Sequence, residues 1–221
     1  MKKILKKMLS MALVFVMIMC LVPPVTTEAS SKPWFLKKHN MYYYEKNQAY
    51  NTATFVFGDD TKDYKITDLK SSNKKVLTVS TFYDSFTYLD IRTRAPGKAT
   101  ITFKAKVGSK TYSYKCKVVV HTYENPVKSL KIGKTNYASE FAYMNYFTLR
   151  AQKNLKGKLA ITTNKNWKIK NIEVYDYKSD NITKVKNNKT ITLNKGQALW
   201  VTCINKKTGA QTTTTLSNAT W

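Results

Sequence analysis

The amino-acid sequence predicts an all-β protein made of two β-sandwich domains in tandem. Apolar and polar residues alternate with a period of two over many short runs, which is typical of half-buried strands. Turn residues separate these runs about every 8 to 12 positions, as in sandwich folds. Only residues 138–146 have weak helical character. With 221 residues, of which 43% are hydrophobic, the chain is long enough to bury one or two cores.

Residues 1–29 are predicted to be a secretory signal peptide. Four lysines precede an apolar run at residues 8–22, and a small-residue cleavage site precedes Ser30. The run is shorter than the ~20 residues that a membrane-spanning helix needs, so no transmembrane segment is expected after cleavage. Met19 stands before Cys20, where lipid attachment would require a small residue. The chain ends in L-S-N-A-T-W without a sorting pentapeptide, so surface retention is expected to be non-covalent.

The first domain is expected to span residues 41–120, after an irregular lead-in at residues 30–40. The clearest pattern is a hairpin in its second half. Ala99, Ile101, Phe103 and Ala105 face one side of the first strand, and Tyr112 to Val120 alternate in the same way after a turn at Gly108. The strands expected in this domain are residues 41–45, 52–57, 64–69, 76–81, 88–94, 99–105 and 112–120.

Three segments between residues 71 and 120 carry a family resemblance. They read S-S-N-K-K-V-L-T-V-S, R-A-P-G-K-A-T-I-T-F and Y-S-Y-K-C-K-V-V-V. Together they resemble the group-two bacterial immunoglobulin-like domain of invasin- and intimin-type surface proteins. The resemblance covers about residues 41–120 and implies an immunoglobulin-like sandwich. Such modules mostly hold or present other parts of a surface protein. The resemblance therefore implies an architecture and no particular ligand.

A linker is predicted at residues 121–127, because Asn125-Pro126 favours an extended or turning chain. Residues 128–221 then form the second all-β domain, in which Gly209 supplies the positive φ of a hairpin loop. This half loosely resembles the lysine-rich β modules of secreted proteins from Gram-positive bacteria. Its expected strands are residues 130–132, 146–151, 158–163, 167–169, 172–175, 190–193, 199–204 and 211–216.

The charge of the chain is strongly positive. There are 38 lysine and arginine residues against 13 acidic residues, a formal net charge of +25. Removing the four lysines and one glutamate of the signal leaves +22, shared evenly between the two halves. Such a protein is attracted to polyanions by a field that salt screens. The competing interpretation is that the lysines only keep β surfaces soluble and protect their edges.

The residues that could support catalysis or metal binding are few. His39 and His121 have no neighbouring partners in the sequence, and Cys116 and Cys203 share faces with apolar residues. Asp59, Asp60 and Asp63 could ligate calcium but are better explained as turn residues. No pair of acids is singled out for glycoside cleavage. The sequence therefore predicts no enzyme activity, no metal site and no cofactor.

Aromatic and basic side chains are the candidate binding residues. In a strand, Tyr43 points away from Tyr42 and Tyr44, so one sheet face must carry tyrosine, either as a sugar-stacking surface with Trp34 or as packed core. Trp167 and Trp200 lie in regular strands and are expected in the core. The candidate binding residues are Trp34, Tyr43, Lys98, Lys104, Lys106, Lys115 and Lys117.

These observations predict a secreted, non-enzymatic binding, adhesion or display protein of the outer face of a Gram-positive cell. Its expected partners are anionic cell-wall polymers or glycans, contacted through the basic surface. The alternative is a carbohydrate-binding protein that uses exposed aromatics. No compact nucleic-acid recognition motif is present in the sequence.

Overall fold

The computed structural model describes residues 32–57, 64–83, 87–149 and 153–218. As predicted, the architecture is all-β: strands and two short 3-10 helices form the regular structure of these residues. Within these ranges no helix is long and apolar enough to cross a membrane. The expected signal peptide, Cys20 and the acidic loop of Asp59, Asp60 and Asp63 lie outside the described residues.

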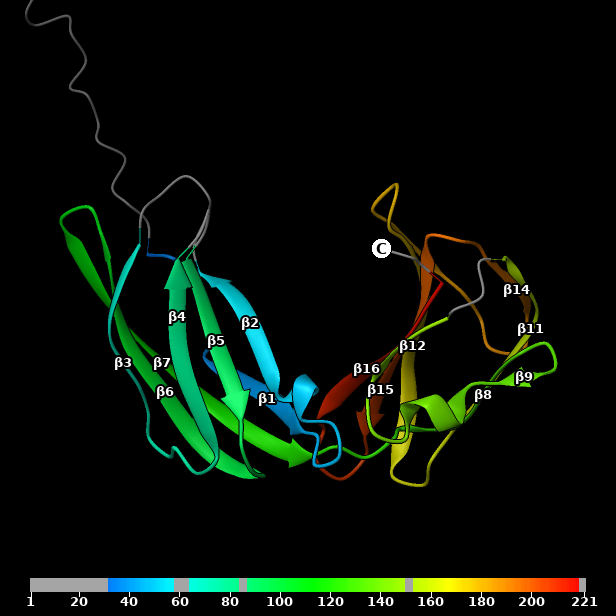
Figure 1. The fold of residues 1–221 in the computed structure, drawn as a ribbon, viewed down its shortest axis with the longest axis horizontal. Coiled ribbons are helices and arrows are strands. Elements are labelled where there is room, and N and C mark those ends of the chain that lie inside the picture. Colours follow the sequence, from blue (N-terminus) through cyan, green and yellow to red (C-terminus); the bar gives the residue numbers. More distant parts are fainter. Residues whose placement is uncertain (1–31, 58–63, 84–86, 150–152, 219–221) are drawn as a thin grey trace, which may run out of the picture.

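The N-terminal sandwich packs a four-stranded sheet, in the order β1-β7-β6-β3, against a three-stranded sheet, in the order β2-β5-β4 (Figure 1). The strand β1 pairs with β7 in parallel, and the other neighbours are antiparallel. Its elements are β1 (Lys38–Tyr43), a 3-10 helix (Gln48–Asn51), β2 (Thr52–Phe57), β3 (Lys65–Ser71), β4 (Leu77–Tyr83), β5 (Thr87–Thr93), β6 (Gly97–Val107) and β7 (Lys110–Thr122).

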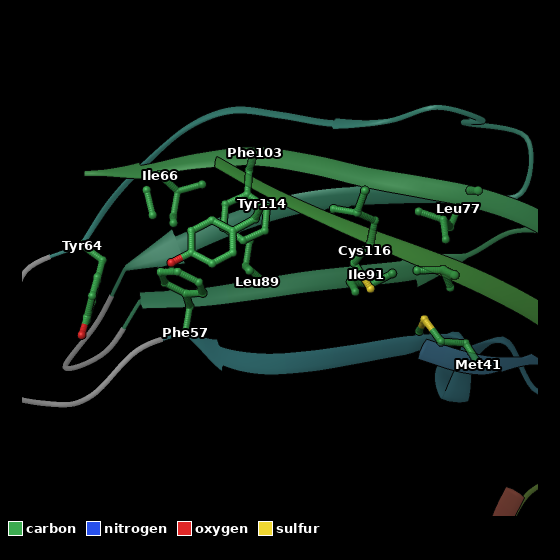
Figure 2. Close-up of a cluster of buried hydrophobic side chains, with 14 of the residues drawn as sticks. Met41, Phe57, Tyr64, Ile66, Leu77, Leu89, Ile91, Phe103, Tyr114 and Cys116 are labelled. Atoms are coloured by element: carbon green, nitrogen blue, oxygen red, sulfur yellow. The ribbon is translucent and has the colours of Figure 1, made fainter. Parts of the chain in front are cut away.

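The core of this sandwich lies between the two sheets, where side chains from both sheets point toward one another (Figure 2). The ring of Phe57 on β2 meets Phe103 of β6 and Tyr114 of β7 edge-on, at centroid distances of 5.3 and 5.2 Å. Alternate residues of β6 and β7 are buried, which confirms the predicted hairpin pattern. The lysines between these buried positions must therefore point outward.

The C-terminal sandwich packs a five-stranded sheet, β10-β16-β15-β12-β13, against a four-stranded sheet, β14-β11-β8-β9. Leu159, Leu193, Leu199 and Leu216 are fully buried in its core. Its elements are β8 (Val127–Ile132), β9 (Thr135–Asn136), a 3-10 helix (Ala138–Phe141), β10 (Tyr146–Thr148), β11 (Leu155–Thr163), β12 (Trp167–Asp176), β13 (Asn181–Lys184), β14 (Thr190–Leu193), β15 (Gln197–Asn205) and β16 (Gln211–Ser217).

Several predicted boundaries need correction. The lead-in is not irregular up to residue 40, because Lys38 to Asn40 already pair with β7. The strand β7 continues through Thr122, so the connection between the sandwiches is residues 123–126. The strands expected at residues 167–169 and 172–175 are one strand, β12, with a register shift between Ile169 and Asn171. The strand β13 was not predicted, because all its residues are exposed and leave no alternation of buried positions.

Tyrosines fill the junction between the two sandwiches. Tyr42 packs against the C-terminal core, and Tyr44 is buried. The Tyr50 hydroxyl donates to the carbonyl of Tyr146 at 3.3 Å. Burial raises the pKa of Tyr42 to about 12. These tyrosines are therefore packing residues that connect the first strand to the second sandwich.

Candidate functional site

The outer face of the sheet β1-β7-β6-β3 concentrates positive charge. All its lysines are exposed, and they come from every strand of the sheet. We call this surface the basic face. Its lysines are Lys38 of β1, Lys65 and Lys70 of β3, Lys98, Lys104 and Lys106 of β6, and Lys115 and Lys117 of β7.

The register of the β6-β7 hairpin gives these lysines a regular order. Five successive outward-facing rows pair Lys98 with Val119, Thr100 with Lys117, Thr102 with Lys115, Lys104 with Ser113, and Lys106 with Thr111. Each row therefore contains one lysine. We call Lys98, Lys117, Lys115, Lys104 and Lys106 the lysine ladder. Successive rows are about 6.8 Å apart, since an antiparallel strand rises ~3.4 Å per residue.

Lysines of the two edge strands flank the ladder. Lys38 of β1 pairs with Lys117, Lys70 of β3 pairs with Thr102, and Lys65 pairs with Lys106. The ladder is thus the central line of a wider basic surface.

One acidic residue interrupts the basic face. The Asp68 carboxylate lies 2.9 Å from the Lys104 ammonium, at the register shift of β3. A hydrogen bond from Lys104, together with its positive charge, lowers the pKa of Asp68. The other ladder lysines form neither an ion pair nor a side-chain hydrogen bond with any described residue. Their ammonium groups are therefore available to an external anion.

A groove opens at the Lys98 end of the ladder. It has a volume of about 820 Å³ and includes Lys38, Lys98 and Lys117 in its lining. Gly209 and Gln211 of the C-terminal sandwich line it as well. As the sequence predicts, Gly209 has a positive φ, 71°, in the turn between β15 and β16. The groove thus joins the ladder to a hairpin of the second sandwich.

The structure brings Trp34 to the edge of the basic face. Its side chain is 77% exposed, and it shares a groove of about 590 Å³ with Lys115 and Lys117. The Tyr114 hydroxyl donates to the carbonyl of Pro33 at 2.8 Å, which ties this segment to β7. Trp34 and two lysines of the predicted set therefore form one surface.

Tyr43 lies apart from this surface. It is half-buried against the N-terminal core and lines a smaller pocket with Gln48, Arg92 and Arg94. Because Lys38 and Tyr43 are an odd number of residues apart on the same strand, their side chains point to opposite faces of the sheet. Of the two alternatives for Tyr43, the structure favours packing against the core over a stacking surface shared with Trp34.

The opposite face of the sandwich differs in chemistry. The outward positions of the sheet β2-β5-β4 include Thr52, Thr54, Asp90 and Arg92, with no lysine among the described ones. Val56 and Phe82 are exposed beside Tyr88, whose ring stacks on Phe82 at 4.5 Å. The positive charge of the first sandwich is thus concentrated on one of its two faces.

An aromatic pair on the second sandwich was missed by the sequence reasoning. Trp200 is only partly buried, so its expected place in the core is wrong, whereas Trp167 is buried as predicted. The ring of Trp200 stacks on Tyr175 at 4.6 Å, and the Tyr175 hydroxyl donates to Asp180 at 2.6 Å. Trp200 alternates with buried Leu199 and Val201, and this alternation is the signal that it points outward.

The residues considered for catalysis lie in dispersed places. His39 lines the larger groove, and burial lowers its pKa. The His121 ring nitrogen Nε2 lies 3.1 Å from Oδ1 of Asn40. Cys116 and Cys203 are buried in different cores and have free thiols. In the described ranges, no group of three histidine, cysteine or acidic side chains is arranged to hold a metal ion.

Comparison with known proteins gives likenesses of structure only. No family model matches the chain, and no curated protein matches it. Solved structures with similarity include an endo-fucoidan hydrolase of glycoside hydrolase family 107, with 10% identity and a TM-score of 0.32 over 89% of this chain. This chain spans 30% of the length of that hydrolase.

Two further similar structures each contain more than one module or domain. The fibronectin(III)-like modules of Clostridium thermocellum CbhA are 10% identical, with a TM-score of 0.32, over 83% of this chain and 91% of theirs. Domains 5–6 of the surface layer protein SbsC are 15% identical, with a TM-score of 0.27, over 86% of this chain and 99% of theirs. At such identities no ligand or activity is transferred from these proteins.

Proposed function

We propose that this chain is a secreted, non-enzymatic binding or display protein of a Gram-positive cell surface, retained there by contacts between its basic face and anionic wall polymers or glycans. The observation that carries the proposal is the basic face itself. It gathers eight lysines on one sheet, with Asp68 as the acid paired to one of them. Lysines that served only solubility would have no reason to gather on one face of the sandwich while the described residues of the opposite face carry none.

The sandwich architecture supports the display part of the proposal. We assign the first sandwich to the group-two bacterial immunoglobulin-like domains on the three segments between residues 71 and 120. In the structure these segments form most of β4, β6 and β7, with apolar positions buried and lysines outward. A rigid β scaffold with one charged face can hold the protein to a polymer and leave the rest of its surface accessible.

Salt extraction of intact cells tests the retention. The protein, secreted by a Gram-positive host, is expected to stay on washed cells at low ionic strength and to enter the medium as salt rises, because salt screens exposed charges. Cells stripped of anionic wall polymers are the control and should retain less. A protein that remains wholly in the medium at low ionic strength would show that the proposal is wrong.

Sugar binding is a second candidate function, favoured by two aromatic features of the surface. Trp34 is exposed beside ladder lysines, and the Tyr175–Trp200 pair lies on the outer face of the second sandwich near Asp180. Aromatic faces with a few placed polar groups are typical of small-molecule sites. This function predicts glycan binding that survives high salt and is lost in Trp34→Ala or Trp200→Ala. Binding that disappears with salt in the unaltered protein would exclude it.

A further inference from the structure

We propose that the lysine ladder binds a linear polyol phosphate chain in extended form, with one phosphodiester group on each row. The inference rests on the proposed function and specifies which wall polymer the basic face recognises. It depends on two properties of the ladder: the spacing of its rows and the residues paired with its lysines.

The spacing of the rows matches the distance between phosphate groups in one kind of polymer. The five rows cover about 27 Å at ~6.8 Å per row. In an extended chain of three-carbon polyol phosphates, neighbouring phosphorus atoms are about 7 Å apart, from single bonds of ~1.5 Å. Every phosphate can then face a row without bending the polymer. A polyanion with denser or sparser charges would leave either phosphates or lysines unpaired.

The ladder combines its cations with hydroxyl groups. All five cations are lysines, which bind the oxygens of an anion as point charges. Four of the five rows also place a threonine or serine hydroxyl opposite the lysine: Thr100, Thr102, Ser113 and Thr111. A hydroxyl can donate a second hydrogen bond to the same phosphodiester.

The residues of the ladder favour a phosphate chain without bases. Proteins that bind single-stranded nucleic acid stack the bases on aromatic side chains along the strand. The residues paired with the ladder lysines are Val119, Thr100, Thr102, Ser113 and Thr111, so none of the five rows offers a ring. Trp34 lies beside Lys115 and Lys117 only and could contact a single unit of the chain.

The polymer can continue past the ladder into the groove lined by Lys38, Lys98 and Gln211. A chain longer than the ladder would then contact the second sandwich as well. Binding should therefore strengthen with oligomer length until the five rows are filled, and more slowly beyond that.

The experiment measures binding of a defined glycerol phosphate oligomer to the secreted chain by calorimetry at low salt. Inorganic polyphosphate is the denser probe, a glucuronate-containing polysaccharide the sparser one, and oligothymidylate the probe with bases. One variant changes the five ladder lysines to Gln. Its control changes five exposed strand lysines of the second sandwich to Gln: Lys128, Lys131, Lys156, Lys158 and Lys168. Both variants have the same net charge, and a thermal melt checks that both are folded.

A second pair of variants tests the spacing itself. Lys117→Thr with Thr100→Lys moves the ammonium across its own row, because these two residues are paired. Lys117→Thr with Thr52→Lys moves the charge to an exposed position on the other sheet and leaves this row of the β6-β7 hairpin without a lysine, with Lys38 of β1 beside it. Net charge is the same in both. The first is expected to bind the oligomer within about twofold of the unaltered protein, and the second several-fold more weakly.

The expected result for the ladder variant is a loss of about tenfold or more in affinity for the glycerol phosphate oligomer, and for the control variant a loss of less than about threefold. This oligomer should also bind the unaltered protein most tightly of the four probes.

Equal losses in both variants would overturn the inference, because binding would then follow total charge. Tighter binding of oligothymidylate would assign the ladder to nucleic acid instead. If no soluble probe binds while cells still retain the protein, the ladder inference fails and the proposed function stands. Oligomer binding without retention on cells would support the ladder and contradict the proposed function.

Discussion

The ring of Tyr44 stacks on the ring of Tyr123, with centroids 4.5 Å apart and planes inclined by 29°. Tyr44 follows β1 and Tyr123 follows β7, so the pair joins the ends of two parallel neighbouring strands. The Tyr123 hydroxyl is also placed to donate to the carbonyl of Met144 at 2.7 Å or Phe141 at 3.0 Å. Burial raises the pKa of both phenols, which keeps the hydroxyls protonated as donors. One side chain therefore connects the first sandwich to the chain segment before β10.

Two replacements of Tyr123 should destabilise the protein to different extents. Tyr123→Phe keeps the stacked ring and removes the hydroxyl, so a loss of about 0.5–1.5 kcal/mol in the free energy of unfolding is expected. Tyr123→Ala also removes the ring and should cost about 3–5 kcal/mol. Urea unfolding measures both. Tyr143→Phe is the control, because this residue is 50% exposed and its hydroxyl makes only an exposed hydrogen bond with Lys46 at 3.5 Å, so removal of the hydroxyl should change little. Equal effects of the two phenylalanine variants would contradict the role of Tyr123.

Neutralising Asp68 should strengthen polyanion binding. Asp68→Asn releases Lys104 from its ion pair. Asn is suited to the site because Asp68 has a φ of 56°, a left-handed conformation that Asn tolerates. Affinity for the glycerol phosphate oligomer should rise several-fold, because the carboxylate no longer competes for Lys104 or repels the phosphate on that row. Asp90→Asn makes the same charge change on the opposite sheet. A similar gain from that variant would show that only net charge matters.

Gly157 should tolerate no larger residue. A Cβ atom there would lie 2.5 Å from the backbone nitrogen and 2.6 Å from the Cα of Gly133, and backbone atoms cannot move aside cheaply. We expect Gly157→Ala to lower the free energy of unfolding by about 1–3 kcal/mol. Gly209→Asn is the comparison, because a Cβ atom there meets nothing within 4 Å and Asn tolerates its positive φ. Thermal or urea unfolding gives both values, and a Gly157→Ala variant as stable as the parent would refute the close approach.

The two thiols should be unreactive in the folded protein. Burial raises the pKa of Cys116 to about 11 and that of Cys203 to about 12. Thiolate is the reactive form, so iodoacetamide at pH 8 should label neither residue until the protein is unfolded, when both are labelled. Mass spectrometry of proteolytic peptides reads out each site. Rapid labelling of either thiol in the folded state would contradict its burial.

The same pKa shifts predict loss of stability at alkaline pH. A thiol whose pKa is raised on folding gives its full contribution below its unfolded pKa of about 8.5. That contribution is lost as pH rises from there toward 11 for Cys116 and 12 for Cys203. Urea unfolding at several pH values should show the decline, and a variant with both cysteines changed to Ala should show less of it.

Much of the fold could be predicted because the strands carry their own pattern. In β6, buried Ala99, Ile101 and Phe103 alternate with exposed or half-exposed residues, and such alternation depends on no distant part of the chain. Prediction failed where burial comes from distant partners. The segment Lys38 to Asn40 is polar, and it is a strand only because the edge of β7 accepts it. The large apolar ring of Trp200 suggests a place in the core, yet this ring stacks on Tyr175 at the surface.

The sequence by itself determined the sandwich architecture, the charge and the ladder lysines. The two-residue turn at Gly108 and Ser109 sets the register of β6 against β7, so the order of the ladder is a local property of this hairpin. Only the tertiary structure decided what surrounds it. Lys38 lies beside the ladder because β1 pairs in parallel with β7, a strand far along the sequence. Asp68 contacts Lys104 at the point where β3 shifts its register. Contacts of this kind depend on which edges and cores remain to be covered once each strand has formed, and no local pattern encodes that.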